Sequence, residues 1–262
     1  MKKILALMMA VCLIFSLAAC GCGNSSDAEY ITNKGTLVIG MTLFAPMDYY
    51  EGEELIGFEA EFGKAVCDKL GLTPEFVEIN WDAKEMELNA KNIDCIWNGM
   101  TITPERAENM SISIPYMTNK QVVVTKAENA EKYAASLNGA LVVAEAGSAG
   151  ETLATSNEFF KGSEFTAVDS MAKALMDVAA GTSDVAVVDY VASIGSIGEG
   201  TDFENLVVVE TEEFSPEEYG IAFRKGSDMT EKVNEVIKEL AADGTLTEIA
   251  KKYKLEELLS VE

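Results

Sequence analysis

The sequence predicts an α/β protein of two lobes, with a ligand cleft between them. Short apolar runs typical of buried strands alternate with amphipathic helical segments, which favours mostly parallel sheets with helices on both faces. The alternation begins a second time at Ala140, and no Pro- or Ser-rich linker precedes it. Two sheets without a linker suggest lobes joined by extended strands, and 262 residues are enough to build both.

The first half of the chain shows clear strand and helix patterns. The apolar residues Phe58, Phe62, Val66 and Leu70 recur every four positions, which predicts a helix that ends at Gly71. A short helix is expected over Trp81–Asn89, and another that Thr103 caps, with Pro104 at its first position. Strands are predicted at Thr36–Ile39, Glu75–Ile79, Ile93–Trp97 and Gln121–Thr125.

The second half repeats the alternation. Helices are predicted over Gly150–Phe160, over the apolar face from Met171 to Val178 that ends at Gly181, and over Tyr190–Ile197. Two further amphipathic helices are expected around Val233–Leu240 and Leu246–Tyr253. Strands are predicted at Ala140–Ala144, Glu164–Val168, Val185–Val188, Leu206–Val209 and Ile221–Phe223.

Composition excludes several classes of function. The chain has no histidine, which rules out a Ser-His-Asp or Cys-His catalytic centre, a histidine base and a histidine-ligated metal. Its 20 basic and 44 acidic residues give a net charge of −24, so the basic footprint of a nucleic-acid binder is missing. No phosphate loop, dinucleotide glycine fingerprint or carboxylate-rich metal loop appears. We therefore assign no catalytic residue, cofactor or metal.

The N-terminus has the pattern of an export signal. A basic start, Met1–Lys3, precedes an apolar run from Ile4 to Ala19 that is too short for a typical membrane span, so residues 1–19 are predicted to be a signal peptide. The run ends in Ala-Ala-Cys20, which resembles the lipobox of bacterial lipoproteins. That resemblance implies cleavage before Cys20, a lipid on its sulfur and a flexible tether over residues 20–29. Ordinary secretion with cleavage at a small residue is the alternative.

The remaining cysteines leave alternatives open. Cys67 and Cys95 lie in apolar segments, where they would form a disulfide in an exported protein or remain buried free thiols. Cys22 lies in the expected tether, and the sequence assigns it no role.

One group of candidate ligand-binding residues follows the strand that ends at Trp97. Arg106 would lie in the first turn of a helix, where a cation faces the positive end of the helix dipole, so an anion is expected beside it. A guanidinium can grip a carboxylate with two hydrogen bonds. Thr101 could add a hydroxyl, and the Gly99 carbonyl could accept from an ammonium. The alternative is a surface arginine paired with Glu105 or Glu108.

A second group lies in the other predicted lobe. Ser148 and Ala149 join a strand to a helix, so their backbone amides could bind an anion, unless the segment is an ordinary turn. Asp189 follows an apolar strand and could receive an ammonium, or it could cap the next helix. Phe44 and Trp81 could form aromatic walls of the pocket, or belong to the core.

The ordered set of these motifs resembles the polar amino-acid binding proteins of ATP-driven importers, bacterial solute-binding family 3. The resemblance extends from Gly35 to Leu255, and its most specific part is the run Thr101-Ile-Thr-Pro-Glu-Arg106. The other landmarks are Ile39-Gly40, Ala45-Pro46, Gly57-Phe58-Glu59, Leu70-Gly71-Leu72, Phe76-Val77-Glu78, Trp81-Asp82, Ile93-Asp94, Ser113-Ile114-Pro115-Tyr116, Gly147-Ser148, Asp184 with Asp189, and Gly220 to Gly226.

The resemblance implies a fold of the type II periplasmic binding proteins. Lobe 1 would comprise residues 30–116 and 215–262, lobe 2 residues 120–210, and the hinge residues 117–119 and 211–214. A ligand held in the cleft would be enclosed when the lobes close.

The resemblance also implies roles for single residues. Arg106 would bind the α-carboxylate with Thr101 and the lobe 2 amides of Ser148 and Ala149. The carboxylate of Asp189 and the carbonyl of Gly99 would receive the α-ammonium. Around the side chain of the ligand, Phe44 and Trp81 would be aromatic walls, with Asn98 and Met41 as further contacts.

Two departures from the family pattern bear on the ligand. Met41 stands where binders of basic amino acids carry an acid, and Trp97-Asn98 replaces a smaller pair, so that Trp97 would narrow the pocket or supply a stacking face. Both point to a neutral polar or sulfur-containing amino acid.

The function expected from the resemblance is capture of a free amino acid outside the cytoplasm, by a lipid-anchored monomer that delivers it to a membrane permease. The alternatives are a binder of another solute such as an opine, a sensory receptor, and an enzyme like cyclohexadienyl dehydratase. For that enzyme Glu145 is a conceivable but poorly placed catalytic carboxylate.

Overall fold

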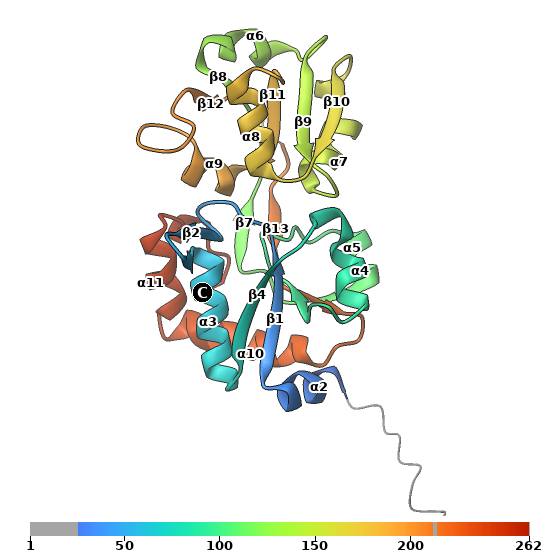
Figure 1. Ribbon diagram of the computed structural model, residues 1–262, viewed down its shortest axis with the longest axis vertical. Helices are drawn as coiled ribbons and strands as arrows, with labels where there is room; N and C mark the ends of the chain where they lie inside the picture. The colour runs from blue at the N-terminus through green and yellow to red at the C-terminus, as the bar shows by residue number, and fades with distance from the viewer. Residues whose placement is uncertain (1–25, 212–213, 262) are drawn as a thin grey trace, which may run out of the picture.

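Two α/β bodies lie one above the other in the computed structural model, which describes residues 26–211 and 214–261 (Figure 1). Two strands run between them, β7 (Met117–Asn119) and β13 (Glu217–Tyr219), which pair antiparallel. The second of these strands lies closer to the C-terminus than the hinge expected at residues 211–214. The signal peptide, Cys20 and Cys22 lie outside the described residues.

The lower body of Figure 1, which we call lobe 1, contains a five-stranded sheet in the order β4-β1-β5-β14-β6. It is built from both ends of the described chain. The strands are β1 (Thr36–Met41), β4 (Thr73–Glu78), β5 (Cys95–Ile96), β6 (Met110–Ile112) and β14 (Ala222–Arg224), with a hairpin of β2 (Tyr49–Glu51) and β3 (Glu54–Ile56). The helices are α2 (Asp27–Lys34), α3 (Phe58–Leu70), α4 (Lys84–Asn89), α5 (Pro104–Asn109), α10 (Met229–Ala242) and α11 (Thr245–Lys252), with short 3-10 turns at Trp81–Ala83 and Glu256–Leu258.

The upper body, lobe 2, has a sheet in the order β10-β9-β11-β8-β12. Its strands are β8 (Gln121–Lys126), β9 (Leu141–Glu145), β10 (Glu164–Val168), β11 (Val185–Asp189) and β12 (Leu206–Val208). Its helices are α6 (Ala130–Ala135), α7 (Ala149–Ser156), α8 (Met171–Ala180) and α9 (Tyr190–Ser196), with 3-10 turns at Ala127–Asn129 and Glu158–Phe160. As the sequence predicted, α8 ends at Gly181, which takes a left-handed conformation with φ of 80°.

The expectation of mostly parallel sheets is confirmed for strand direction, because four of the five strands in each sheet run the same way, but each sheet also contains one reversed strand that the sequence did not indicate. In lobe 1, β1 runs parallel to β4 and β5, but β14 is antiparallel to β5 and β6. Lobe 2 repeats this mixture, because β9 is parallel to β10 and β11 whereas β8 is antiparallel to β11 and β12. The reversed strands β8 and β14 are the ones that follow β7 and β13. A strand that enters a lobe from the hinge starts at the cleft and runs away from it, whereas its neighbours run toward the cleft.

The N-terminal boundary of lobe 1 also differs from the expectation of a tether over residues 20–29. Helix α2 begins at Asp27, after the Ser26 side chain accepts a hydrogen bond from the Glu29 amide, and it buries Ala28 and Ile31. The Asp27 carboxylate pairs with Arg224 Nε at 2.8 Å. Residues 27–29 are therefore part of the lobe, because a buried ion pair and an apolar face hold them there.

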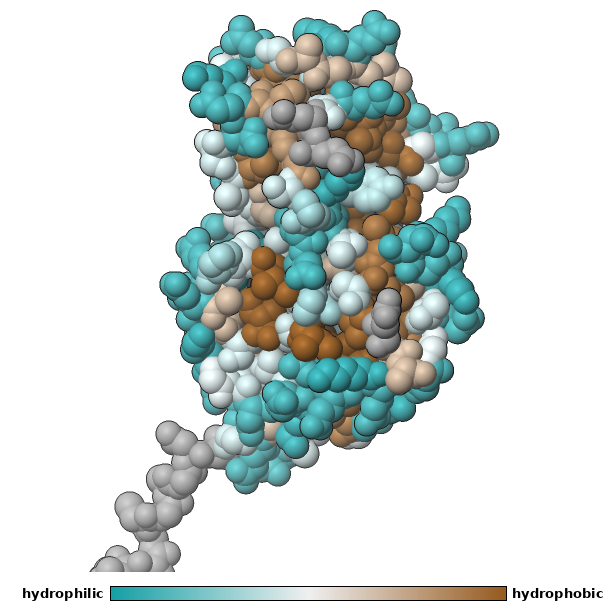
Figure 2. All heavy atoms as spheres, turned by 180° about the vertical axis from the view of Figure 1, so that it is seen from behind, coloured by the Kyte–Doolittle hydropathy of each residue, from teal (hydrophilic) through white to brown (hydrophobic). Residues whose placement is uncertain are grey.

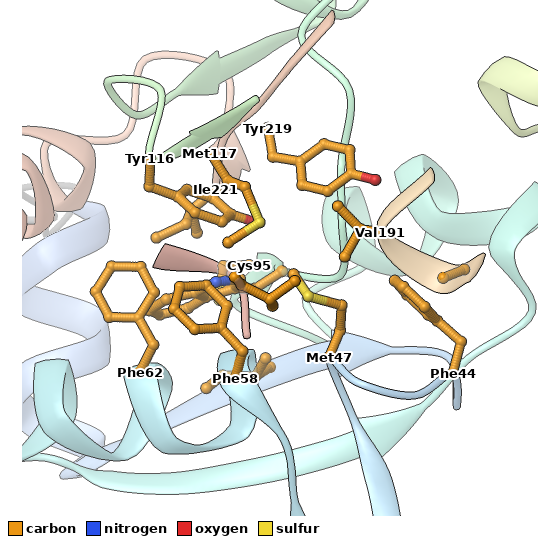
Figure 3. Close-up of a cluster of buried hydrophobic side chains, with 14 of the residues drawn as sticks. Phe44, Met47, Phe58, Phe62, Cys95, Tyr116, Met117, Val191, Tyr219 and Ile221 are labelled. Atoms are coloured by element: carbon orange, nitrogen blue, oxygen red, sulfur yellow. The ribbon is translucent and has the colours of Figure 1, made fainter. Parts of the chain in front are cut away.

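The core of lobe 1 reaches the two connecting strands. Figure 3 shows Phe58 and Phe62 of α3 facing Tyr116, Met117 and Ile221, which lie beside or within the strands of the hinge. The ring centroids of Phe58 and Tyr116 are 6.4 Å apart. Packing at the hinge is thus continuous with that of the lobe, which gives the connecting strands a rigid base.

Two further expectations concern the core and the surface. Cys67 and Cys95 are both buried free thiols, so the disulfide alternative is not realised. On the face in Figure 2, hydrophilic residues cover the outer margins of both lobes and apolar atoms show toward the middle of each. No helix in residues 26–211 and 214–261 is long and apolar enough to cross a membrane.

Candidate functional site

A cavity between the two lobes brings together most of the residues that the sequence selected. Its volume is about 10 Å³, about the least that a single water needs, so the lobes are in close contact around it. A larger hollow of about 840 Å³, also lined by both lobes, opens beside Thr101, Arg106 and Ala149. Its lining comes from both lobes and comprises Trp81, Asn98, Gly99, Thr101, Arg106, Glu145, Ser148, Ala149, Met171 and Asp189.

Arg106 reaches across the cleft. The Thr103 side chain caps α5 by accepting from the Arg106 amide at 3.2 Å, and Pro104 occupies the first helical position, as predicted. The guanidinium donates to the Thr101 carbonyl at 2.8 Å and to the Gly147 carbonyl of lobe 2 at 3.1 Å. No carboxylate in the described ranges lies within ion-pair distance of it, so the alternative pairing with Glu105 or Glu108 is not formed. The guanidinium is therefore free to pair with an anionic ligand.

Asp189 ends β11 on the opposite lobe. Its carboxylate accepts from Tyr219 Oη at 2.7 Å and from Gln121 Nε2. Asp189 also occupies the N-cap position of α9, as the alternative supposed, but its side chain makes no capping bond to the helix. Burial raises its pKa to about 7, and the nearby charge of Glu217 adds to this effect. A cation in the cavity would stabilise the ionised form of Asp189.

The loop from Gly147 to Ala149 closes the cavity from lobe 2. Gly147 has a φ of 70°, and a Cβ there would lie 3.0 Å from the Cα of Asp82 in lobe 1, so both the conformation and the close approach require glycine. Ser148 caps α7 by accepting from the Glu151 amide at 3.1 Å, and Ala149 is the first helical residue. Their amides lie at a helix N-terminus beside the cavity, which favours an anion there.

Lys84 is a buried cation that the sequence did not single out. Its Nζ donates to the carbonyls of Trp81 and Gly147, both at 3.0 Å, and lies 4.8 Å from the centre of the Trp81 ring. Burial lowers its pKa to about 8, with a further lowering by Arg106. Lys84 and Arg106 thus bind the same lobe 2 carbonyl from lobe 1.

Asn98 and Gly99 form one wall of the cavity. The Asn98 amide group donates to the Thr42 carbonyl at 2.8 Å and to Asp48 at 2.9 Å, and its oxygen accepts from Thr42 N and Oγ1. Its hydrogen-bonding groups are thus all used within lobe 1. The Gly99 amide donates to Glu59. Asn98 therefore lines the cavity but is bound on the side away from it.

Three aromatic and apolar residues do not lie where the sequence placed them. Trp97 is 1% exposed and packs in the core at 4.9 Å from the Phe62 ring, so it neither narrows the cavity nor stacks in it. Met41 is buried at the end of β1, outside the cavity lining. Phe44 lies where a Cβ on Gly99 would be 3.2 Å from its ring, and it faces Val191 of lobe 2 in Figure 3, also outside the lining. Trp81 does line the cavity.

Some residues at the site were missed or misjudged. Glu145, which the sequence suggested only as a poorly placed catalytic carboxylate of the enzyme alternative, lines the cavity. Like Asp189 it is a carboxylate at the end of an apolar strand, and that signal could have identified it. Gln121 and Tyr219 bind Asp189 from β8 and from the hinge strand β13, and no local pattern indicates this.

The lobes also touch on the side of α9. A Cβ on Gly195 would lie 2.6 Å from the carbonyl carbon of Ala45, and Ser196 Oγ donates to the Ala45 carbonyl at 3.4 Å. No group of three or more metal-binding side chains is found within the described part of the chain. The arrangement places a cation of lobe 1, Arg106, and a carboxylate of lobe 2, Asp189, in the lining of one small cavity.

Comparisons with known proteins identify relatives along nearly the whole chain. The family model for bacterial extracellular solute-binding proteins, family 3, matches residues 37–256. The arginine-binding extracellular protein ArtP of Bacillus subtilis is 30% identical over 97% of this chain and 98% of its own. The L-cystine-binding protein TcyA of the same organism is 31% identical over 97% of each chain. A substrate-binding protein of a Streptococcus pneumoniae uptake transporter, solved with bound histidine, is 28% identical with a TM-score of 0.80, over 90% of this chain and 99% of that one.

Proposed function

The chain belongs to the bacterial extracellular solute-binding proteins, family 3, and we propose that it captures a free amino acid between its lobes and delivers it to the permease of an ATP-driven importer. The observation that carries this proposal is the placement of Arg106 and Asp189 on opposite lobes, lining the same closed cavity. The relatives named above are binding proteins for arginine, cystine or histidine, which supports an amino acid as ligand.

The charges of the site match the charges of an amino acid backbone. An α-carboxylate would receive hydrogen bonds from Arg106, from the Thr101 hydroxyl and from the amides of Ser148 and Ala149 at the start of α7. An α-ammonium would donate to Asp189 and to the Gly99 carbonyl. Hydrogen bonds to charged groups contribute about 1.5–3 kcal/mol each, so a zwitterion is favoured over a neutral solute.

Lobe closure follows from these contacts. Each of the two α-groups would take partners from both lobes, so both groups are satisfied only when the lobes come together. A ligand shifts an equilibrium by the difference in its affinity for the two states, and here that difference favours the closed one. The permease would recognise the closed form, which presents surfaces of both lobes at once.

The N-terminus fits this role. A signal peptide at residues 1–19 would direct export, and a lipid on Cys20 would hold the protein at the outer face of the membrane. Because α2 belongs to lobe 1, the tether would end before Asp27. Its length would leave the lobes free to turn toward a permease in the same membrane.

Thermal unfolding tests the proposal. The purified protein is unfolded and refolded to remove carried ligand, then heated with each of the twenty amino acids and cystine. A ligand at one hundred times its Kd should stabilise by about 2.7 kcal/mol and raise Tm by several degrees. One or a few amino acids should do so in the wild type, and Arg106→Ala should bind them at least about 100-fold more weakly. A folded wild-type protein that responds to no amino acid would refute the proposal.

A further inference from the structure

Glu145 is a buried carboxylate inside the ligand cavity that the proposed capture of the α-groups does not use. It is the last residue of β9, it is 2% exposed, and it lines the cavity together with Trp81, Met171 and Asp189. Its Oε1 accepts no hydrogen bond from any residue that the structure describes. A buried carboxylate oxygen without a donor is costly, so its retention in the cavity calls for a partner.

The groups that face Glu145 do not supply this partner. The hydroxyl of Thr42, directly after β1 in lobe 1, lies within hydrogen-bonding reach of the carboxylate and lowers its pKa, but it donates its proton to Asn98 Oδ1 at 2.7 Å. Lys84 exerts a favourable charge effect, but its Nζ is bound to two backbone carbonyls and makes no ion pair with Glu145. Asp189 is a like charge. Burial first, and Asp189 second, raise the pKa of Glu145 to about 8. Arg106, the cation of the lining, is turned to the carbonyls of Thr101 and Gly147.

We propose that Glu145 is the specificity-determining residue of this site and accepts a hydrogen bond from a cationic nitrogen on the ligand's side chain, so that the protein prefers a basic amino acid. The inference rests on the proposed function, because Arg106 and Asp189 must hold the α-groups for the side chain to lie toward Glu145. With the α-groups paired and Lys84 bound to carbonyls, Glu145 is the acidic group of the lining that the backbone of an amino acid leaves without a partner.

This inference replaces the expectation of a neutral side chain. That expectation rested on Met41, where an acid would indicate a basic ligand, and on a pocket narrowed by Trp97. Neither residue lines the cavity. The carboxylate comes instead from lobe 2, at Glu145, so the reasons for a neutral ligand no longer apply.

Binding of a cationic side chain should change the number of protons that the site holds. Near pH 7 the ligand-free carboxyl of Glu145 is mostly protonated, because its pKa is about 8. A cationic nitrogen beside it stabilises the carboxylate and lowers this pKa. Binding should therefore release protons, with Asp189 contributing as well, whereas a neutral side chain would leave the proton on Glu145.

Calorimetric titration with matched ligands tests the inference. Arginine, lysine, ornithine and histidine are compared with citrulline, norleucine, norvaline and glutamine as neutral partners, in buffers of different ionisation enthalpy. We expect the wild type to bind a basic member at least 10-fold more tightly than its neutral partner and to release more protons with it. Glu145→Gln should reduce affinity for the basic member at least 10-fold and change that for the neutral one less than 3-fold. Glu164→Gln, which changes an exposed carboxylate of the same lobe, is the control.

The outcomes separate this inference from the proposed function. A wild type that binds a neutral amino acid most tightly overturns the role of Glu145 and leaves amino acid capture intact. If Glu145→Gln loses affinity for the basic amino acid and for its neutral counterpart by the same factor, the role of Glu145 is also overturned, provided that circular dichroism shows the variant folded. If no amino acid binds at all, the proposed function fails first. The preference of the wild type is a test that does not depend on the folding of any variant.

Discussion

The backbone amide of Gly99 donates a hydrogen bond that both carboxylate oxygens of Glu59 accept, at distances of 2.9 and 3.1 Å. The side chain is 1% exposed and also accepts from Tyr116 Oη, beside the hinge. Next to it, Asp48 accepts from the Asn98 side chain at 2.9 Å. The cavity wall formed by Asn98 and Gly99 is thus fixed from behind by two buried carboxyl groups of lobe 1.

This relationship predicts the effect of Glu59→Gln. The amide would present one acceptor instead of two equivalent oxygens, and its NH₂ group would oppose the Gly99 amide or the Tyr116 hydroxyl. We expect a loss of about 1–3 kcal/mol in the free energy of unfolding. The affinity for the amino acid should fall about 10-fold, or about 1.4 kcal/mol of binding free energy, because the Gly99 carbonyl would shift with the wall. Denaturant unfolding and calorimetry measure the two effects.

The control for this prediction is Glu235→Gln on the exposed face of α10. It should change neither quantity. Unchanged affinity in Glu59→Gln would show that the wall does not depend on this carboxylate.

Gly195→Ala should prevent full closure. A Cβ at this position of α9 would lie 2.6 Å from the carbonyl carbon of Ala45 and the nitrogen of Pro46, which are backbone atoms that cannot turn aside. Alanine favours the helix more than glycine does, so lobe 2 itself should be no less stable. We expect ligand affinity to fall about 10-fold or more, which corresponds to a loss of about 1.4 kcal/mol or more in binding free energy.

Small-angle scattering with saturating ligand checks this prediction, and the variant should remain more extended than the wild type. Ser196→Ala is the matched control, since it removes the 3.4 Å contact with Ala45 without adding an atom to the interface. Wild-type affinity in Gly195→Ala would mean that this side of the cleft opens without effect on binding.

The ligand-free protein should lose stability as the pH rises from about 4.5 to 8. Burial raises the pKa of Glu59 and Asp189 to about 7 and that of Glu145 to about 8. The unfolded chain has ordinary carboxyl values near 4, so in this window the folded state holds more protons. Unfolding free energy then decreases with pH. The lowered pKa of Glu61 makes the free energy of unfolding rise with pH instead. This contribution is complete once the pH exceeds the pKa of Glu61 in the unfolded chain, so it does not offset the loss at higher pH.

Thermal melts between pH 5 and 8.5 measure this slope. Asp189→Asn should flatten it, because one of the groups that titrate in the window is removed. A Tm that climbs steadily across the same range would contradict the assignment of these carboxyl groups as protonated in the closed, ligand-free protein.

Asp27→Ala should destabilise lobe 1 and leave ligand affinity unchanged. Asp27 accepts from Arg224 Nε at 2.8 Å and from Ser227 Oγ at 2.7 Å, with little exposure of either charged side chain. Removing one partner of a buried ion pair costs about 3–5 kcal/mol, and the value here should lie near the lower end because Asp94 also pairs with Arg224. Glu29→Ala on the exposed face of α2 should cost less than 1 kcal/mol, by roughly the limit for surface sites. A similar loss in both variants would argue against the ion pair as the anchor of α2.

The sequence alone determined the features that depend on a segment's own residues, such as where a helix begins, where it ends and which face it buries. The four-residue spacing from Phe58 to Leu70, the cap at Thr103 and the stop at Gly181 each satisfy a local requirement of a helix, and all three are confirmed. The positions of Arg106 and Asp189 could be inferred for a similar reason. One lies in the first turn of a helix and the other at the end of a buried strand, and in an α/β lobe both places face the cleft.

Only the tertiary structure decided which of these segments meet. Tyr219 and Asp189 are joined by a hydrogen bond, and so are Glu59 and Gly99, but nothing near any of them in sequence indicates the partner. The same holds for Met41 and Trp97, which follow the pattern of site residues and yet lie outside the cavity. The reason is physical: a local pattern fixes the conformation and the buried face of one element, whereas contact across a cleft depends on how two separately folded lobes are set against each other by the hinge.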